Sequence, residues 1–291
     1  MERYNGNEQL YNHPMRSCGK RSKMERKTSY HRHVCKKMKI TSVINYCTID
    51  HMFLKPCIEG VLPFSEKVIV AYCDHFLDGT PENRELINKG IAENPKAEFI
   101  EFEYDPSQSS RWHHNACRKL GIMNAPEDTD YFMFLDVDEV LEPDKFVKWW
   151  SMQQNDLKDS YRLACYWYFR EFKYRLKVWE EAIALVKAGP LTQNDHIIFH
   201  QEERKAMFWC LPEHRRTDKC KLDGLPFSHH FSWVRSKEGM LKKVKSWGHN
   251  KDLDWSVLVE KEFEQPFRGK DMIFGDREYD IVQPYLNIPI T

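Results

Sequence analysis

The chain has 291 residues, with 44 basic and 44 acidic side chains, 41% apolar residues, 13% aromatic residues and only 12 glycines. This size suits one large domain or two small ones, and the aromatic content excludes collagen-like, coiled-coil and wholly disordered chains. No stretch approaches the roughly 18 uninterrupted apolar residues of a membrane span, so we expect a soluble protein.

The charges are unevenly divided between residues 1–39 and the rest of the chain. The first 39 residues hold eleven Lys or Arg against three Glu, a net charge of +8, so the remaining residues carry a net charge of −8. With few apolar residues to bury, this basic tail is expected to be disordered. It could contact an anionic membrane surface, whereas nucleic acid is the less favoured partner.

Nine cysteines are scattered along the chain without a Cys-x-x-Cys pair. Their odd number and spacing suggest neither a zinc ribbon nor a disulfide framework. Several, such as Cys47 and Cys73, end apolar runs in which a thiol behaves as a small hydrophobic group. These features predict a reducing, cytoplasmic setting.

Two kinds of apolar pattern alternate in the first half of the chain. Short β-branched runs predict strands, and apolar residues at intervals of three and four predict helices. Pro56 should confine the regular part of the first helix to about Lys55 onward, because proline is tolerated in a first turn. In chain order we expect a strand at 40–47, a helix at 51–62, a strand at 67–73, a helix at 82–93, a strand at 97–104, a helix at 109–123 and a strand at 131–135.

This alternation predicts parallel strands with right-handed crossovers, and hence an α/β sandwich. The second half is less regular, with predicted strands at 161–170 and 177–187, a mixed loop at 202–216, and an amphipathic helix at 236–249 capped by Ser236. In parallel sheets ligands bind beyond the carboxyl ends of the strands. The residues that follow each strand are therefore the first candidates for a functional site.

Asp136 and Asp138 directly follow the apolar strand predicted at 131–135. Alternation along an extended chain puts both carboxylates on the same side, where their charges are costly unless a cation neutralises them. Oxygen ligands suit Mg²⁺ or Mn²⁺, which in turn bind phosphate oxygens. The pair predicts a divalent metal that holds a diphosphate, although an acidic turn without a metal remains the structural alternative.

Four blocks of the sequence resemble, in order, the glycosyltransferases of the GT-A fold, particularly the family-two type with a Leu-Asp-x-Asp-Glu-Val-Leu signature. The blocks are 42–64, 66–80, 111–115 with Phe134-Leu-Asp-Val-Asp-Glu-Val-Leu141, and 229–247. The resemblance implies a GT-A-type α/β/α sandwich with a mostly parallel central sheet and a C-terminal helical extension. It divides the chain into the tail at 1–39, a nucleotide-sugar-binding and catalytic domain at 40–234, and a helix and extension at 235–291 packed on the core.

The resemblance also implies which residues bind the donor. Asp74 would meet the nucleobase after the second strand, although Cys73 competes for that place. Arg111 and Asn115 match an Arg-Asn pair that faces the donor, and Asp136 would contact the ribose or the metal.

For the metal, the resemblance implies Asp138 as a ligand, Asp136 as a possible second, and His230 as a late ligand, with His229 able to exchange places with His230. The cofactor would be Mn²⁺ or Mg²⁺, and an imidazole ligand suits Mn²⁺ better. A buried structural histidine is the alternative for His230.

The implied reaction moves a sugar from a nucleoside-diphosphate sugar to a hydroxyl of a glycan or other acceptor, with inversion. A carboxylate must then take the proton of the acceptor hydroxyl. Glu181 and Glu180, in Trp179-Glu-Glu181, are the predicted catalytic pair, and solvent-facing strand residues are the structural alternative. Glu202, Glu203 and Glu213 compete for the role.

Two other function classes stay open at this stage. A nucleotidyltransferase on a related sheet would also need paired carboxylates and magnesium, but the segment Asn45-Tyr-Cys-Thr-Ile-Asp50 has no glycine with which to cradle a triphosphate. A non-catalytic protein that binds sugar or nucleic acid would use the acidic cluster only structurally.

Overall fold

The computed structural model describes residues 38–193, 204, 208, 210–247, 250, 252–275 and 277–290, with the backbone alone at 192–193. The predicted basic tail, apart from its last two residues, and the candidates Glu202 and Glu203 lie outside the described residues. Within these ranges, no helix combines the length and the apolar character that crossing a bilayer requires.

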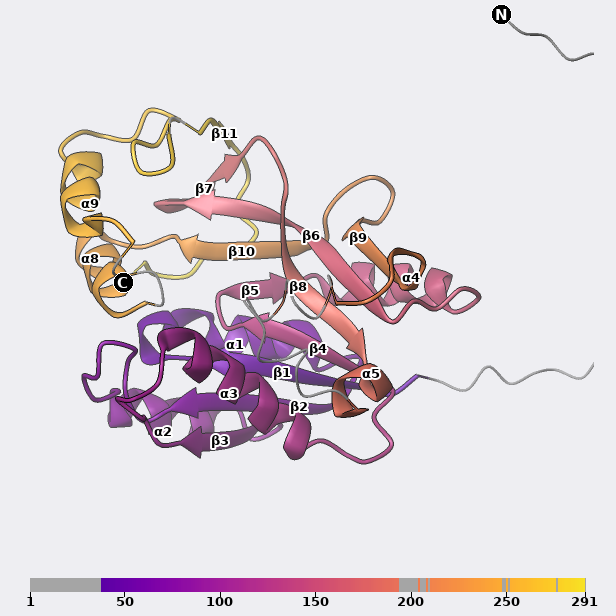
Figure 1. Cartoon of the computed structure of the whole chain (residues 1–291). Coiled ribbons are helices and arrows are strands. Elements are labelled where there is room, and N and C mark those ends of the chain that lie inside the picture. The colour runs from indigo at the N-terminus through magenta and orange to yellow at the C-terminus, as the bar shows by residue number, and fades with distance from the viewer. Residues whose placement is uncertain are drawn as a thin grey trace, which may run out of the picture. The chain divides into compact units, whose positions relative to one another are not determined.

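Four parallel strands form the first half of the sheet, in the order β3-β2-β1-β4 (Figure 1). They are β1 (Ile40–Tyr46), β2 (Ser65–Cys73), β3 (Glu98–Phe102) and β4 (Tyr131–Asp136). The connecting helices are α1 (His51–Val61), α2 (Arg84–Glu93) and α3 (Ser110–Met123). The predicted α/β fold is confirmed. Apolar β-branched runs that alternate with helices favour this parallel arrangement.

Helices cover both faces of these strands. Ile44 of β1 joins the cluster that contains Phe53 of α1, whereas its neighbour Val43 faces the other way, toward Ile122 of α3. The alternation follows from the two-residue period of a strand. Gly121 allows α3 to approach closely, since a Cβ there would lie 2.3 Å from Cγ1 of Val43. This contact brings the side chains of α3 to the end of β4.

The second half of the sheet continues beyond β4 with antiparallel neighbours. β8 (Glu180–Lys187) pairs with β4, β6 (Ser160–Phe169) with β8, β7 (Glu171–Leu176) with β6, and β11 (Tyr279–Ile281) with β7. β10 (Ser228–Trp233) lies antiparallel to β5 (Glu139–Leu141) and parallel to β6, which also pairs with β9 (Arg216–Cys220). Helices α4 (Pro143–Gln153) and α5 (Ala188–Gln193) and 3-10 turns at Thr48–Asp50 and Glu213–Arg215 complete this part.

Two helices near the C-terminus, α8 (Lys237–Ser246) and α9 (Trp255–Phe263), pack on an aromatic cluster that includes Trp233 of β10. As predicted, Ser236 caps α8, with its Oγ accepting a hydrogen bond from Gly239 N at 3.1 Å. The helix contacts the 3-10 turn that follows β1. α8 therefore lies near the carboxyl end of the parallel strands (Figure 1).

The prediction that α1 becomes regular only near Lys55 is wrong. The helix begins at His51 and Pro56 lies inside it. Burial of Phe53, Cys57 and Ile58 against the sheet outweighs the hydrogen bond that proline cannot donate.

Candidate functional site

A cavity of about 560 Å³ lies at the carboxyl ends of β1, β2 and β4. Asn45, Cys73 and Asp136 line it from the three strand ends, and α3 and α8 supply further walls. This is where an α/β sheet is expected to bind a ligand. The cavity is large enough for a small-molecule ligand, whose sites usually measure about 300–1,000 Å³.

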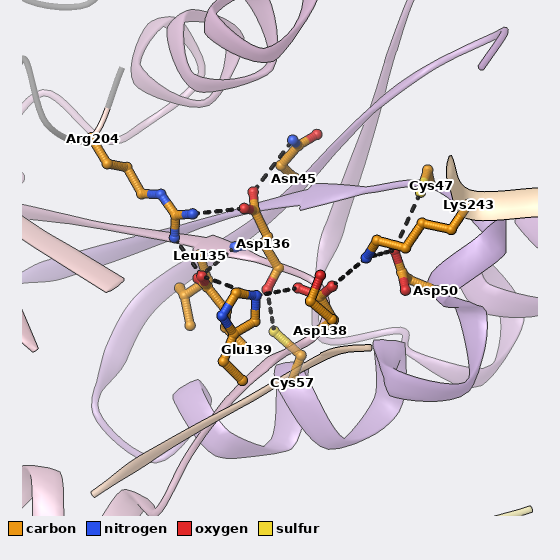
Figure 2. Close-up of polar contacts among 12 residues, drawn as sticks. Asn45, Cys47, Asp50, Cys57, Leu135, Asp136, Asp138, Glu139, Arg204 and Lys243 are labelled. Carbon is orange, nitrogen blue, oxygen red and sulfur yellow. Dashed lines mark hydrogen bonds and ion pairs between the residues drawn. The ribbon is translucent and has the colours of Figure 1, made fainter. Parts of the chain in front are cut away.

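Asp136, the last residue of β4, is held by two arginines. Nη2 of Arg118 lies 2.7 Å from its Oδ1. Nη2 of Arg204 lies 2.9 Å from its Oδ2, as Figure 2 shows. Burial alone would raise the pKa of Asp136, but the guanidinium groups of Arg204 and Arg118 outweigh it and hold the pKa well below its usual range. Asp136 is therefore a carboxylate with both oxygens engaged.

Glu139, at the start of β5, stabilises the positions of Asp136 and Arg204. Its Oε2 accepts a hydrogen bond from Asp136 N at 2.9 Å, and its Oε1 accepts one from Arg204 at 2.5 Å. The side chain is fully buried, and burial raises its pKa against the attraction of Arg204. Glu139 thus fixes the backbone at the strand end and orients Arg204.

Asp138 is 4% exposed and also lines the cavity. Its Oδ2 accepts a hydrogen bond from Nζ of Lys243 at 2.9 Å, while Nε2 of His230 lies 3.6 Å from its Oδ1. Burial opposes ionisation, but Lys243 and His230 lower the pKa of Asp138 overall. The structure therefore brings together two of the residues predicted to bind a metal, Asp138 and His230.

Asp50 lies next to Asp138 and shares its cations. Nζ of Lys243 is 3.6 Å from Oδ2 of Asp50, and Arg235 donates a short hydrogen bond to Oδ1 (Figure 2 shows Lys243 between the two carboxylates). Arg235 is anchored further by its bond to Ile49 O at 3.2 Å. Sequence reasoning missed this group. Lys243 carried a signal, since it falls on the apolar stripe of α8 where a lysine is unexpected.

A divalent cation at this place would need an oxygen that the protein does not already use. Oδ1 of Asp138 is buried and accepts no hydrogen bond from the described residues, and it faces His230, so these two side chains fit a cation. Asp136 does not offer a free oxygen in the same way. In the described part of the chain no three His, Cys, Asp or Glu side chains converge as a ready-made metal cage.

Asp74 and Cys73, the two candidates for the nucleobase contact, differ in position relative to the cavity. Cys73 lines the cavity as the structure describes it, and Asp74 does not. Oδ1 of Asp74 accepts a hydrogen bond from Tyr104 N at 2.7 Å and lies 2.8 Å from Nδ1 of His75. Burial opposes its ionisation, but these contacts lower the pKa of Asp74. Asp74 thus braces the β2 and β3 ends.

The two residues of the predicted Arg-Asn pair on α3 differ in their position relative to the cavity. Arg111 lines the cavity, whereas Asn115 is buried and is not part of the described lining. One turn further along, Arg118 reaches Asp136 instead. His113 and His114 also line the cavity, and Nδ1 of His114 lies 3.3 Å from Nδ2 of Asn45.

Glu180 and Glu181, the predicted catalytic pair, start β8 and lie outside the described lining of the cavity. Nη1 of Arg277 lies 2.6 Å from Oε1 of Glu180, and Nη1 of Arg162 lies 3.0 Å from Oε2 of Glu181. Glu213 is exposed in its 3-10 turn and is likewise not part of that lining. The geometry lends no support to a catalytic role for these three glutamates.

Glu82 binds Thr48 through its carboxylate, in the connection between β1 and α1. Its carboxylate accepts bonds from Thr48 N at 3.2 Å, from Asn83 N at 3.3 Å and, at short range, from the Thr48 hydroxyl. Burial raises the pKa of Glu82, although these bonds oppose the rise. A protein carboxylate therefore already fills the position at which the loop could receive an anion.

No family model matches the chain, and no curated protein sequence matches it. Among solved structures, residues 1–349 of TarS from S. aureus are similar over 78% of this chain and 72% of that chain, with 13% identity and a TM-score of 0.43. The 4-diphosphocytidyl-2C-methyl-D-erythritol synthase from Anaerococcus prevotii DSM 20548 is similar over 62% of this chain and 86% of that chain, with 8% identity and a TM-score of 0.39.

Proposed function

We propose that the chain is a metal-dependent glycosyltransferase that moves a sugar from a nucleoside-diphosphate sugar to an acceptor hydroxyl with inversion. The observation that carries the proposal is the pair Asp136 and Asp138 at the carboxyl end of β4, in a 560 Å³ cavity, with His230 facing Asp138. The GT-A resemblance of the sequence blocks that contain these residues supports the same reading.

The donor would lie along the ends of β2, β1 and β4. We place the nucleobase near Cys73 and His113, and the ribose near Asp136, whose acceptor oxygens are kept ionised by their arginines. The diphosphate would then reach Asp138, where His230 and Lys243 meet. In this placement the donor meets the lining residues in the order Cys73 of β2, Asp136 of β4 and then Asp138.

Asp138 and His230 would hold Mn²⁺ or Mg²⁺, which when bound stabilises negative charge on the diphosphate leaving group. Asp136, with both oxygens engaged, would bind the donor rather than the metal. The acceptor hydroxyl must lose its proton to a carboxylate. Of the carboxylates weighed from the sequence for that role, Glu202 and Glu203 lie outside the described residues.

The Glu82 contact speaks against a nucleotidyltransferase. Such an enzyme would present the backbone N–H groups after β1 to a triphosphate, but Thr48 N, in that connection, already donates to Glu82. A triphosphate there would have to displace a buried carboxylate from its hydrogen bonds with the backbone N–H and the hydroxyl of Thr48, each worth roughly 1.5–3 kcal/mol when made to a charged group.

Thermal-shift measurements on the full chain test the proposal. UDP or GDP with Mn²⁺ should raise the melting temperature by more than nucleotide and metal do separately, because a ligand that binds the folded state stabilises it. Asp138→Asn should lose the metal-dependent part of the shift. If neither nucleotide shifts the melting temperature with Mn²⁺ present, the proposed function is wrong.

A further inference from the structure

The site that we propose for the metal already contains a cation. Lys243 is 8% exposed, and its Nζ is 2.9 Å from Oδ2 of Asp138, the same carboxylate whose Oδ1 faces His230. A divalent ion at Oδ1 and an ammonium at Oδ2 would be separated by only a few ångströms and would repel each other in a partly buried setting.

Charge balance strengthens this competition. Two carboxylates, Asp50 and Asp138, face two cations, Arg235 and Lys243. A divalent ion would add two positive charges to a group that is already neutral, so its binding favours the departure of a cation.

Lys243 is the cation that can leave. Arg235 is 2% exposed, bonds to Asp50, Ile49 O and Ser232 O, and is not part of the described cavity lining. Lys243 lines the cavity and carries its charge on a flexible four-carbon chain. An ammonium released into this cavity would meet the phosphate oxygens of a bound nucleotide, with which it forms strong hydrogen bonds.

We propose that Lys243 competes with the divalent ion for Asp138 and, when displaced, binds the diphosphate of the donor. The inference rests on the proposed function and adds to it a positioning residue from α8. It predicts opposite effects of Lys243 on two ligands. Lys243 weakens the binding of the metal alone and strengthens the binding of the nucleotide alone.

Calorimetric titration of the full chain separates these effects. Apparent affinity falls with the fraction of molecules in which the site is accessible, so Lys243→Met should bind Mn²⁺ about tenfold more tightly than the wild type. UDP titrated in the presence of EDTA should bind the same variant at least about threefold more weakly. Lys245→Met, an exposed lysine of the same helix, should match the wild type in both titrations.

Asp50→Asn combined with Lys243→Met keeps the buried charges balanced and should show the same two changes if the single variant does not fold. Mn²⁺ affinity that is equal or weaker in a folded Lys243 variant would overturn the competition, and unchanged UDP affinity would overturn the diphosphate contact. Mn²⁺ binding to the variant alone would support the competition even if UDP failed to bind. Absence of Mn²⁺ binding to every form would overturn it.

Discussion

Arg118 of α3 joins two groups at the end of β4, since its Nη2 lies 2.7 Å from Oδ1 of Asp136 and its Nη1 donates to Leu135 O at 2.9 Å. The guanidinium is fully buried. Because its planar fork spans both acceptors, Arg118 sets the direction in which Asp136 enters the cavity. The close approach of α3 at Gly121 makes this reach possible.

Arg118→Lys tests this role. A lysine keeps the charge but does not reproduce the planar fork that reaches the backbone carbonyl and the carboxylate together, so the free energy of unfolding should fall by about 1–3 kcal/mol. Urea denaturation measures the change. Arg84→Lys, the same replacement at an exposed arginine paired with Glu101, should cost less than about 0.5 kcal/mol. Equal effects at the two positions would argue against a special role for Arg118.

Asp138→Asn should abolish metal-dependent turnover. The amide cannot supply an anionic oxygen to the cation, and loss of such transition-state stabilisation lowers kcat by about 100-fold or more. Asp223→Asn, on an exposed aspartate paired with Lys148, serves as the matched control and should retain turnover. Donor hydrolysis measured with and without Mn²⁺ gives the result, and full activity in folded Asp138→Asn protein would reject the metal role.

Glu181→Gln should affect stability rather than catalysis. The change removes the ion pair with Arg162, which keeps a hydrogen bond to Glu181 O at 3.2 Å, so the unfolding free energy should fall by only about 1 kcal/mol. Turnover should stay within about threefold of the wild type, a difference of less than 1 kcal/mol in the barrier. A loss of kcat of two orders of magnitude at unchanged donor affinity would instead restore Glu181 as the proton acceptor predicted from the sequence.

The stability of the fold should fall between pH 7.5 and 5.5 because of His229. This side chain is buried between Tyr168 OH, 2.8 Å from its Nδ1, and Oε1 of Glu142, 3.2 Å from its Nε2. Burial lowers the pKa of His229 below its usual 6.5, although Glu142 opposes the shift. As the pH falls below 6.5, the unfolded chain therefore gains the proton more readily than the folded chain, and stability is lost.

Urea titrations at the two pH values check this dependence. The wild type should be less stable at pH 5.5 than at pH 7.5, because the unfolded chain takes up the His229 proton more readily. His229→Gln should show a smaller difference between pH 7.5 and 5.5 than the wild type. Glu142 does not interfere, because its lowered pKa places its titration below pH 4.5. An identical pH dependence in both proteins would exclude His229 as the cause.

The parallel half of the fold was predictable because its strands are continuous apolar runs. Residues such as Val43 and Ile44 are both buried, on opposite faces, which only a strand covered on both sides allows. The later strands are harder to read. In β7, Phe172 and Leu176 alternate with charged residues in a period-two pattern. The pattern is too short to predict a strand with certainty from the sequence.

The site residues that directly follow a predicted strand could be predicted from the sequence. Those contributed by segments distant in the chain could not. Asp136 and Asp138 were predicted as site residues because they come directly after a predicted strand. His230 was predicted from the resemblance to GT-A glycosyltransferases. The cations that balance them include Arg118 of α3 and Lys243 of α8. Lys243 lies more than 100 residues from Asp138 in the chain, and no local pattern predicts that pairing. The two glutamates of β8 do not line the cavity as described, and they pair instead with Arg162 and Arg277.

Anomalous diffraction from a crystal of the full chain grown with Mn²⁺ and UDP would show whether Asp138 holds the metal beside the nucleotide. We expect a manganese peak between Asp138 and His230, next to the bound nucleotide. A nucleotide bound at the strand ends with no manganese at Asp138, or manganese bound elsewhere in the chain, would contradict it.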